Sequence, residues 1–281
     1  MSDAVKPRRI WLCADDYGIS PGVNRAIRDL IERGRLNATS VMVLGAAIDD
    51  GEIAALKAVA TCSARCALGL HVTLTAPFRP LSMHFRPLVG DMFPPFPKLL
   101  RMGLAHRLDR ERLRAEVMAQ LAAFADQFER PPDFVDGHQH VQLYPQIREA
   151  FVEAVRKAAP KAWVRQCGRD LPLARRLAAP KALVLDLLNA RFRHRALKAG
   201  LAFNRGFAGA YDFTRNADFD GMMRHFIEGL PEDGLIMCHP GFVDDILTSL
   251  DPMTDVRERE HAFLASPAFP LLLSENNVTL E

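Results

Sequence analysis

The sequence contains no apolar run long enough for a secretory signal or a membrane span. The stretch after Arg9 is interrupted by Asp15 after about five residues, whereas a spanning helix needs roughly 20. Cysteines are also few: there are five, an odd number, and none are arranged as a CxxC pair. A disulfide-stabilised secreted scaffold is therefore not expected, and the sequence predicts a cytoplasmic protein with reduced cysteines.

An excess of one charge sign is likewise missing over the chain as a whole. The formal net charge is +2 for 281 residues, which gives no reason to expect a nucleic-acid partner. One segment departs from this balance: residues 165–205 contain ten Arg and Lys against two Asp, with leucines between them. A solvated basic helix face explains this composition, and so does a surface that contacts anionic lipid head groups at the membrane periphery.

Internal repeats and low-complexity linkers are absent from the sequence, so residues 1–281 are expected to form a single domain. Short apolar runs of β type alternate with helical patterns, an order typical of parallel βα units. The expected strands are residues 9–14, 39–44, 67–74, 133–136, 162–166, 201–204, 235–238 and 278–280, and the expected helices are residues 21–33, 49–61, 109–129, 144–157, 170–199, 217–229 and the tail from 255. The predicted fold class is α/β: a TIM-like (βα) barrel, closed or else incomplete and distorted, with an open doubly wound sheet as the alternative.

A Pro-rich segment, residues 76–107, breaks this alternation after the third expected strand. It also contains several aromatic residues and methionines. Long irregular insertions in compact domains usually serve as lids or binding loops. We therefore expect this segment to border a binding site.

Acidic and imidazole side chains lie at the ends of four expected strands, which is where α/β barrels carry their active sites. Taken singly, these clusters have ordinary explanations, such as a turn for two adjacent Asp residues or a core position for a lone His. In an extended chain, however, residues two apart face the same side, so three of these side chains would share one face. The residues are Asp15 and Asp16, His71, the face-sharing Asp136, His138 and His140, and His239.

Together the four strand ends supply the ligand types that bind Zn²⁺ and other first-row metals. Two histidines and one carboxylate leave coordination positions for water, which becomes acidic enough at a metal ion to attack a carbonyl near neutral pH. A second carboxylate can serve as a general base, and a further histidine can protonate a leaving amine or stabilise an oxyanion.

Four strings, CADDYGISPGVNRAI, GLHVTLT, DGHQHVQLYPQI and MCHPGF, resemble the YdjC/ChbG family of carbohydrate deacetylases, which includes hopanoid-associated (HpnK-like) members. They span residues 13–242 and match in content, order and spacing. The resemblance implies a TIM-like barrel that binds one divalent metal ion through Asp16, His71 and His138. It also implies that Asp15 is the general base and that His239 is the acid or oxyanion partner. Gln142 departs from the pattern, because family members often carry a histidine there, and this puts the substrate in doubt.

The expected function is metal-dependent removal of an acetyl group from an N-acetylated sugar, either chitooligosaccharide-like or lipid-linked. Imidazole ligands favour Zn²⁺ or Co²⁺, whereas the resemblance leaves Mg²⁺ open. The residues expected to contact substrate are His140, Tyr17, and Phe207 and Tyr211 of the Gly-rich string GFAGAYDF, which a simple turn explains equally well. The resemblance allows a homodimer. The alternatives are a hydrolase of another amide or ester and a sugar-binding homologue without catalysis.

Overall fold

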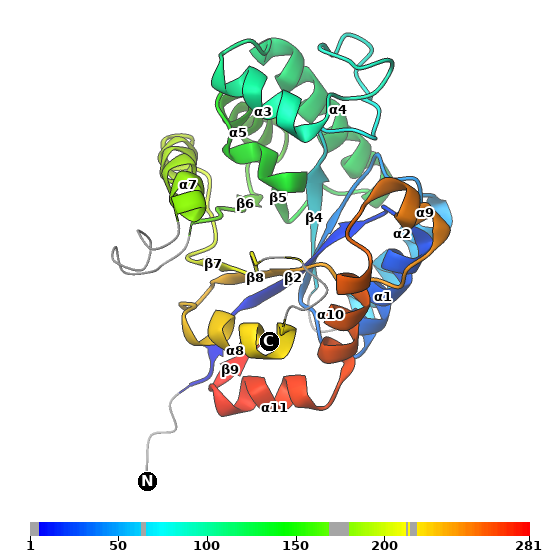
Figure 1. Cartoon of the computed structure of the whole chain (residues 1–281), viewed down its shortest axis with the longest axis vertical. Coiled ribbons are helices and arrows are strands. Elements are labelled where there is room, and N and C mark those ends of the chain that lie inside the picture. Colours follow the sequence, from blue (N-terminus) through cyan, green and yellow to red (C-terminus); the bar gives the residue numbers. More distant parts are fainter. Residues whose placement is uncertain (1–5, 63–65, 169–179, 212, 214–217) are drawn as a thin grey trace.

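The computed structural model describes residues 6–62, 66–168, 180–211, 213 and 218–281. Its main sheet has seven parallel strands in the order β6-β5-β4-β3-β2-β8-β7, and it curls so that helices cover its outer face (Figure 1). These strands are β2 (Trp11–Tyr17), β3 (Ala38–Val41), β4 (Ala67–Val72), β5 (Phe134–Gly137), β6 (Trp163–Val164), β7 (Phe207–Ala208) and β8 (Leu235–Cys238). A small parallel pair joins the chain ends through β1 (Arg8–Arg9) and β9 (Val278–Thr279).

The helices follow the strands as the alternating pattern predicted, apart from two that were not predicted, at Phe96–Leu104 and Asp245–Leu250. Residues 170–179 of the predicted helix at 170–199 lie outside the described residues. The helices are α1 (Pro21–Glu32), α2 (Asp50–Cys62), α3 (Phe96–Leu104), α4 (Arg110–Phe128), the 3₁₀ helix η1 (His138–Leu143), α5 (Ile147–Ala158), α7 (Pro180–Lys198), α8 (Phe219–Glu228), α9 (Asp245–Leu250), α10 (Asp255–Ala265) and α11 (Ala268–Glu275). Helix α1 begins as expected, because the Ser20 hydroxyl accepts a hydrogen bond from the backbone N–H of Val23 and Pro21 occupies the first turn. No helix in the described ranges has both the length and the apolarity that crossing a bilayer requires.

One edge strand of the curled sheet, β6, contacts the segment that leads into β7 at a narrow seam. Val164 of β6 and Phe203 form a parallel bridge, and the backbone N–H of Val164 donates to the carbonyl of Ala202 at 2.9 Å. Beside it, the Asn204 side chain accepts a hydrogen bond from the backbone N–H of Gln166. The chain then continues into β7, which pairs with β8. This arrangement confirms the TIM-like barrel in its incomplete form.

The predicted strand at 201–204 is wrong in position. Only Phe203 pairs there, while β7 forms at Phe207–Ala208, inside the string predicted to be a loop or turn. Gly209 explains why the backbone can approach β8 so closely: a Cβ at this position would lie 2.1 Å from the carbonyl oxygen of Met237, and its φ is +101°. The absence of a side chain at 209 therefore permits the approach of β7 to β8.

The Pro-rich segment 76–107 is less irregular than predicted. It contains helix α3, and its aromatic side chains join the hydrophobic core, where the rings of Phe85 and Phe93 meet edge to face at 4.8 Å. Both rings are fully buried. The segment was predicted to border a binding site, and its first residues, Ala76, Pro77 and Phe78, do line a cavity.

Asn37 is expected to be a major contributor to stability, because its buried amide joins three segments. Its side-chain oxygen accepts from the N–H of Leu12, and its NH₂ group donates to the carbonyls of Ile10 and Leu280. Replacing it by Ala leaves three buried backbone groups without this partner, so we expect a loss of about 2–4 kcal/mol in the free energy of unfolding. Urea denaturation measures this. Asn276→Ala, a half-buried control with one bond to its own helix, should lose less; equal losses would contradict the argument.

Candidate active site and metal centre

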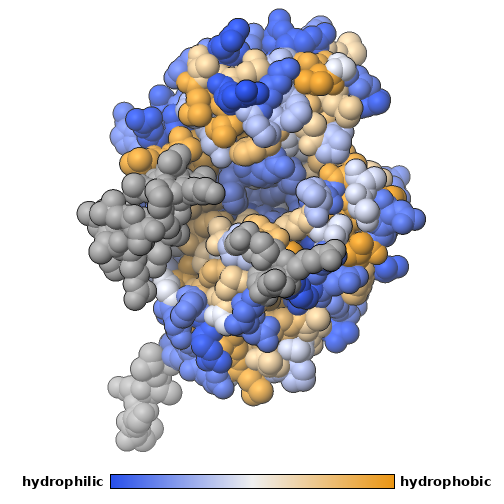
Figure 2. Space-filling view, viewed as in Figure 1, coloured by the Kyte–Doolittle hydropathy of each residue, from blue (hydrophilic) through white to orange (hydrophobic). Residues whose placement is uncertain are grey.

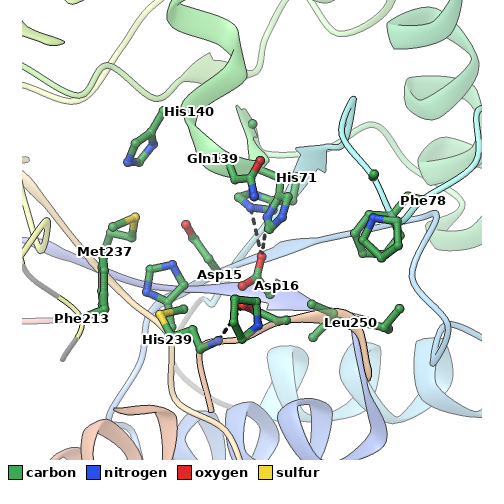
Figure 3. Close-up of a pocket in the computed structure, with 18 residues that line it drawn as sticks. Asp15, Asp16, His71, Phe78, Gln139, His140, Phe213, Met237, His239 and Leu250 are labelled. Carbon is green, nitrogen blue, oxygen red and sulfur yellow. Dashed lines mark hydrogen bonds and ion pairs between the residues drawn. The ribbon is translucent and has the colours of Figure 1, made fainter. Parts of the chain in front are cut away.

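A cavity of about 380 Å³ opens at the carboxyl ends of the strands. Figure 2 shows it as a hollow near the middle of the molecular face, with hydrophilic residues at its base. Six of the predicted functional side chains line it: Asp15, Asp16, His71, His138, His140 and His239. Figure 3 shows Asp15, Asp16, His71, His140 and His239 around it. The parallel strands thus bring these residues, which are distant in the sequence, to one edge of the barrel.

A β-bulge explains how two consecutive aspartates face the same cavity. The prediction that this strand ends before the acidic pair is wrong. Strand β2 continues to Tyr17, with a register shift against β3 between Ala14 and Tyr17. Asp16 has a φ of +69°. Because successive side chains of a regular strand point to opposite faces, this irregularity is what allows both Asp15 and Asp16 to line the cavity.

Tyr17, the next residue, lies elsewhere. Its side chain is buried behind the strand, where the hydroxyl contacts Glu52 and accepts a hydrogen bond from Arg28. It is not among the residues that line the cavity. This position does not support the prediction that Tyr17 contacts substrate.

Asp16, His71 and His138 form a compact cluster whose ligand atoms lie within 4.8 Å of one another. Asp16 Oδ1 is 3.3 Å from His71 Nε2 and 3.0 Å from His138 Nδ1. The other ring nitrogen of His71 contacts Asp136 Oδ1 at 2.6 Å. Such a carboxylate, placed behind an imidazole, fixes the tautomer and the orientation of a metal ligand. The donor set therefore fits a divalent metal ion of the kind that accepts imidazole and carboxylate ligands.

The prediction that Asp136, His138 and His140 share one extended face is wrong. Strand β5 ends at Gly137, and the chain turns at once into η1, where Gln139 and His140 have positive φ values. This turn separates the two histidines: His138 faces Asp16, whereas His140 lies 3.5 Å from Cys167 Sγ. Burial lowers the pKa of His140 to about 3, so its ring is neutral. His140 still lines the cavity, away from the cluster (Figure 3).

Arg165 is a site residue that the sequence did not reveal. Its guanidinium is fully buried, and it donates to both oxygens of Asp15 at 2.6 Å while also pairing with Asp136 Oδ2 at 2.6 Å. Burial alone would raise the pKa of Asp15, but the charge of Arg165 outweighs it and holds this pKa well below its usual value. Cys13, Asp15 and Asp136 also come close enough to hold a cation. The guanidinium of Arg165 fills that role, since its Nη2 lies 3.0 Å from Cys13 Sγ.

Arg257, from helix α10, is the second buried arginine of the site. One of its nitrogens donates to Asp16 Oδ2 at 2.7 Å and to Asp251 Oδ2 at 2.6 Å, and its Nε donates to the carbonyl of Met253. Asp251 and Met253 line the cavity. Arg257 therefore holds one carboxylate oxygen of Asp16 and fixes the loop before α10, which leaves the other oxygen of Asp16 facing His71 and His138.

His239 lies across the cavity from the cluster (Figure 3). Its backbone N–H donates to Glu260, a buried carboxyl whose pKa burial raises to about 7. Burial lowers the pKa of the His239 ring to about 4. Its Nδ1 has no hydrogen-bond partner among the described residues. A neutral imidazole that lines the cavity can hydrogen-bond a substrate directly.

Tyr211 and Phe207, which were predicted to contact substrate, instead pack against residues next to the cavity. Tyr211 donates its hydroxyl to Glu260, and Phe207 packs edge-on against His140 with ring centres 5.6 Å apart. Neither lines the cavity, whereas Phe213, at the end of the same string, does. The Phe213 ring meets His239 edge to face at 5.3 Å.

Comparison with known proteins places this architecture in a family. The family model described as "YdjC-like protein" matches residues 9–275. A chitooligosaccharide deacetylase from Serratia marcescens is 30% identical over 237 residues, covering 82% of this chain and 81% of that protein. One from Yersinia pestis is 28% identical over 278 residues, covering 95% and 94%.

A solved structure shows the same fold. A protein from Enterococcus faecalis, named as a cellobiose-phosphate cleavage protein, superposes with a TM-score of 0.74, covering 98% of this chain and 97% of that one at 20% identity. At that identity the likeness concerns the fold alone. With the family model matched over nearly the whole sequence, the chain belongs to the YdjC-like protein family.

Proposed function

We propose that this protein is a metal-dependent carbohydrate N-deacetylase, a hydrolase that removes the acetyl group from an N-acetylated sugar. The observation that carries the proposal is the cluster of Asp16, His71 and His138, with Asp15 and His239 lining the same cavity. Relatives that cover most of the chain are named chitooligosaccharide deacetylases, which supports a sugar amide as the substrate class.

Asp16, His71 and His138 would hold the metal ion, with Asp136 fixing His71 from behind. A bound divalent ion supplies an acidic water and polarises the amide carbonyl. Two imidazoles and one carboxylate favour Zn²⁺ or Co²⁺, and Mg²⁺ stays a further candidate. The identity of the ion remains a prediction.

Asp15 and His239 supply the proton chemistry in this proposal. Arg165 keeps Asp15 ionised, so its carboxylate is available to accept the proton of the attacking water and to hold that water in place. The His239 ring lines the cavity, so it can bind the acetyl oxygen or pass a proton to the departing sugar amine. Phe213 packs against His239 and limits how its ring can turn.

The type of N-acetylated sugar, the cellular location and the oligomeric state remain proposals. The names of the relatives favour chitooligosaccharides over a lipid-linked acetyl sugar. A cytoplasmic location, a homodimer and peripheral membrane contact through residues 165–205 stay predictions. Arg165 is excluded from such a contact, because it is buried at the active site.

The proposed function is tested by measuring free-amine release from diacetylchitobiose and from a lipid-linked N-acetylglucosamine. Metal-stripped protein receives Zn²⁺, Co²⁺ or Mg²⁺ before the assay. We expect release that depends on the added ion, and the preferred substrate separates the oligosaccharide from the lipid-linked branch. If neither substrate releases amine while metal is shown to be bound, the proposal fails in favour of a hydrolase of another amide or ester.

A further inference from the structure

A second cavity, of about 360 Å³, lies between helices α5 and α7 and shares no lining residue with the active site. The two helices pack together through the rings of Phe151 and Phe192, which lie 5.9 Å apart, and Figure 1 shows them side by side. Beyond this contact the helices leave a polar pocket. Its walls are Arg148 and Glu149 from α5, and Ala190, Arg191, His194 and Arg195 from α7.

The pocket is strongly cationic. Three arginines face a single acid, Glu149. Burial would raise the pKa of Glu149, but the hydrogen bond and charge of Arg148 outweigh it and hold this pKa below its usual value, so the side chain is a carboxylate. Its Oε1 is engaged by Arg148 Nε at 3.0 Å and lies 3.8 Å from Arg195 Nε. The acid thus orients two guanidiniums, and the walls retain a net charge of about +2.

Two further basic groups that line the pocket, Arg191 and His194, are exposed. Arg191 and His194 form no hydrogen bond or ion pair with any residue in the described ranges, although both line the pocket. Arg191 and Arg195 are one helical turn apart and therefore project from the same face of α7. Ala190, which also lines the pocket, has only a methyl side chain and so takes up little of its volume.

One wall of the pocket is rigid. Arg148 is almost fully buried, and its Nη1 donates to the carbonyl of Leu143 at 3.3 Å, at the end of η1. Both Arg148 and Glu149 sit in the first turn of α5, where the helix dipole adds positive potential. A buried guanidinium on α5 therefore lies in the same pocket as two exposed guanidiniums on α7.

We propose that this pocket binds a phosphate group, carried either by a soluble phosphate ester or by a lipid head group. Planar guanidiniums match the oxygens of phosphate with paired hydrogen bonds. A doubly charged phosphate balances the net charge of the walls, which a single carboxylate does not. The site is separate from the metal centre and does not depend on the proposed deacetylase activity.

The test uses the full chain and inorganic phosphate as the probe, with binding measured by titration calorimetry. The variant Arg191→Gln/Arg195→Gln changes only exposed side chains, so it should fold, and circular dichroism checks this. We expect its Kd for phosphate to rise about tenfold or more, because charge-assisted hydrogen bonds are lost. The matched control Arg156→Gln/Lys157→Gln removes two exposed charges from α5 outside the pocket and should keep the original Kd.

An unchanged Kd in the first variant would overturn the proposal, because the phosphate would then bind elsewhere, for instance at the metal centre. An equal loss in both variants would overturn it as well, since only the total charge would matter. Co-sedimentation with phosphatidylcholine vesicles, with and without phosphatidic acid, then identifies the source of the phosphate. Binding that free phosphate competes away indicates a lipid head group, and saturable phosphate binding without sedimentation indicates a soluble ester.

Discussion

Replacing His71 by alanine is expected to lower kcat/KM for amine release by on the order of 10³-fold or more, about 4 kcal/mol of transition-state stabilisation. The ring lies between Asp16 and Asp136, at contacts of 3.3 and 2.6 Å, and supplies one of the two imidazoles of the cluster. Without it, a divalent ion would keep only one carboxylate and one imidazole. Metal content after dialysis, measured by elemental analysis, should fall together with activity.

The control for this variant is His225→Ala, which removes an exposed imidazole on α8. It should retain both metal and activity. Metal content equal to that of the unchanged protein in His71→Ala would remove His71 from the ligand set. Activity lost with metal retained would instead assign His71 to substrate binding.

Asp15→Asn is expected to lower kcat by about 10²–10⁴-fold while metal content stays unchanged, because the substitution removes a proton acceptor and not a ligand. The amide has the same shape, but it leaves Arg165 with Asp136 as its remaining acidic partner. Breaking one buried ion pair costs about 3–5 kcal/mol of stability, so the thermal midpoint must be measured beside the kinetics.

Two further measurements keep the Asp15 result interpretable. Asp245→Asn, at an exposed position at the start of α9, should leave kcat and stability unchanged. Asp15→Glu keeps the charge and should recover part of the stability if the ion pair with Arg165 is what was lost. Turnover close to normal in the folded Asp15→Asn protein excludes Asp15 as the base.

The site residues that the sequence predicts correctly are those at the ends of apolar strands or directly after them. Parallel strands place their carboxyl ends at one edge, so Asp15, Asp16, His71, His138 and His239 line one cavity although the sequence separates them by up to 224 residues. That inference needs only the order of strands and helices. It does not need the exact ends of each strand, which were wrong for β2 and for 201–204.

The residues that were missed depend on tertiary contacts. The sequence places Arg165 in the basic segment 165–205, because composition does not distinguish a buried guanidinium from a solvated one. The signal that the sequence does contain is the position of Arg165 directly after the short apolar strand β6. Arg257 comes from the tail and reaches Asp16 across 241 residues, with no local signal. The bulge at Asp16 is a register shift against β3, and no short window of sequence contains this pairing. The turn at His140 breaks the extended chain directly after β5, where the sequence shows only a run of polar residues.

The seam between β6 and the segment 202–204 has a consequence for hydrogen–deuterium exchange. Strands β3 and β4 have neighbours on both sides, whereas in the described part of the chain one bridge and the side-chain hydrogen bonds of Asn204 hold the seam. Amides at Val164 and Phe203 should therefore exchange earlier than those of the central strands. Arg165 follows the bridge directly, so each opening of the seam would also loosen the cation that balances Asp15 and Asp136. The charge balance of the active site would then depend on the pairing of β6 with the segment 202–204.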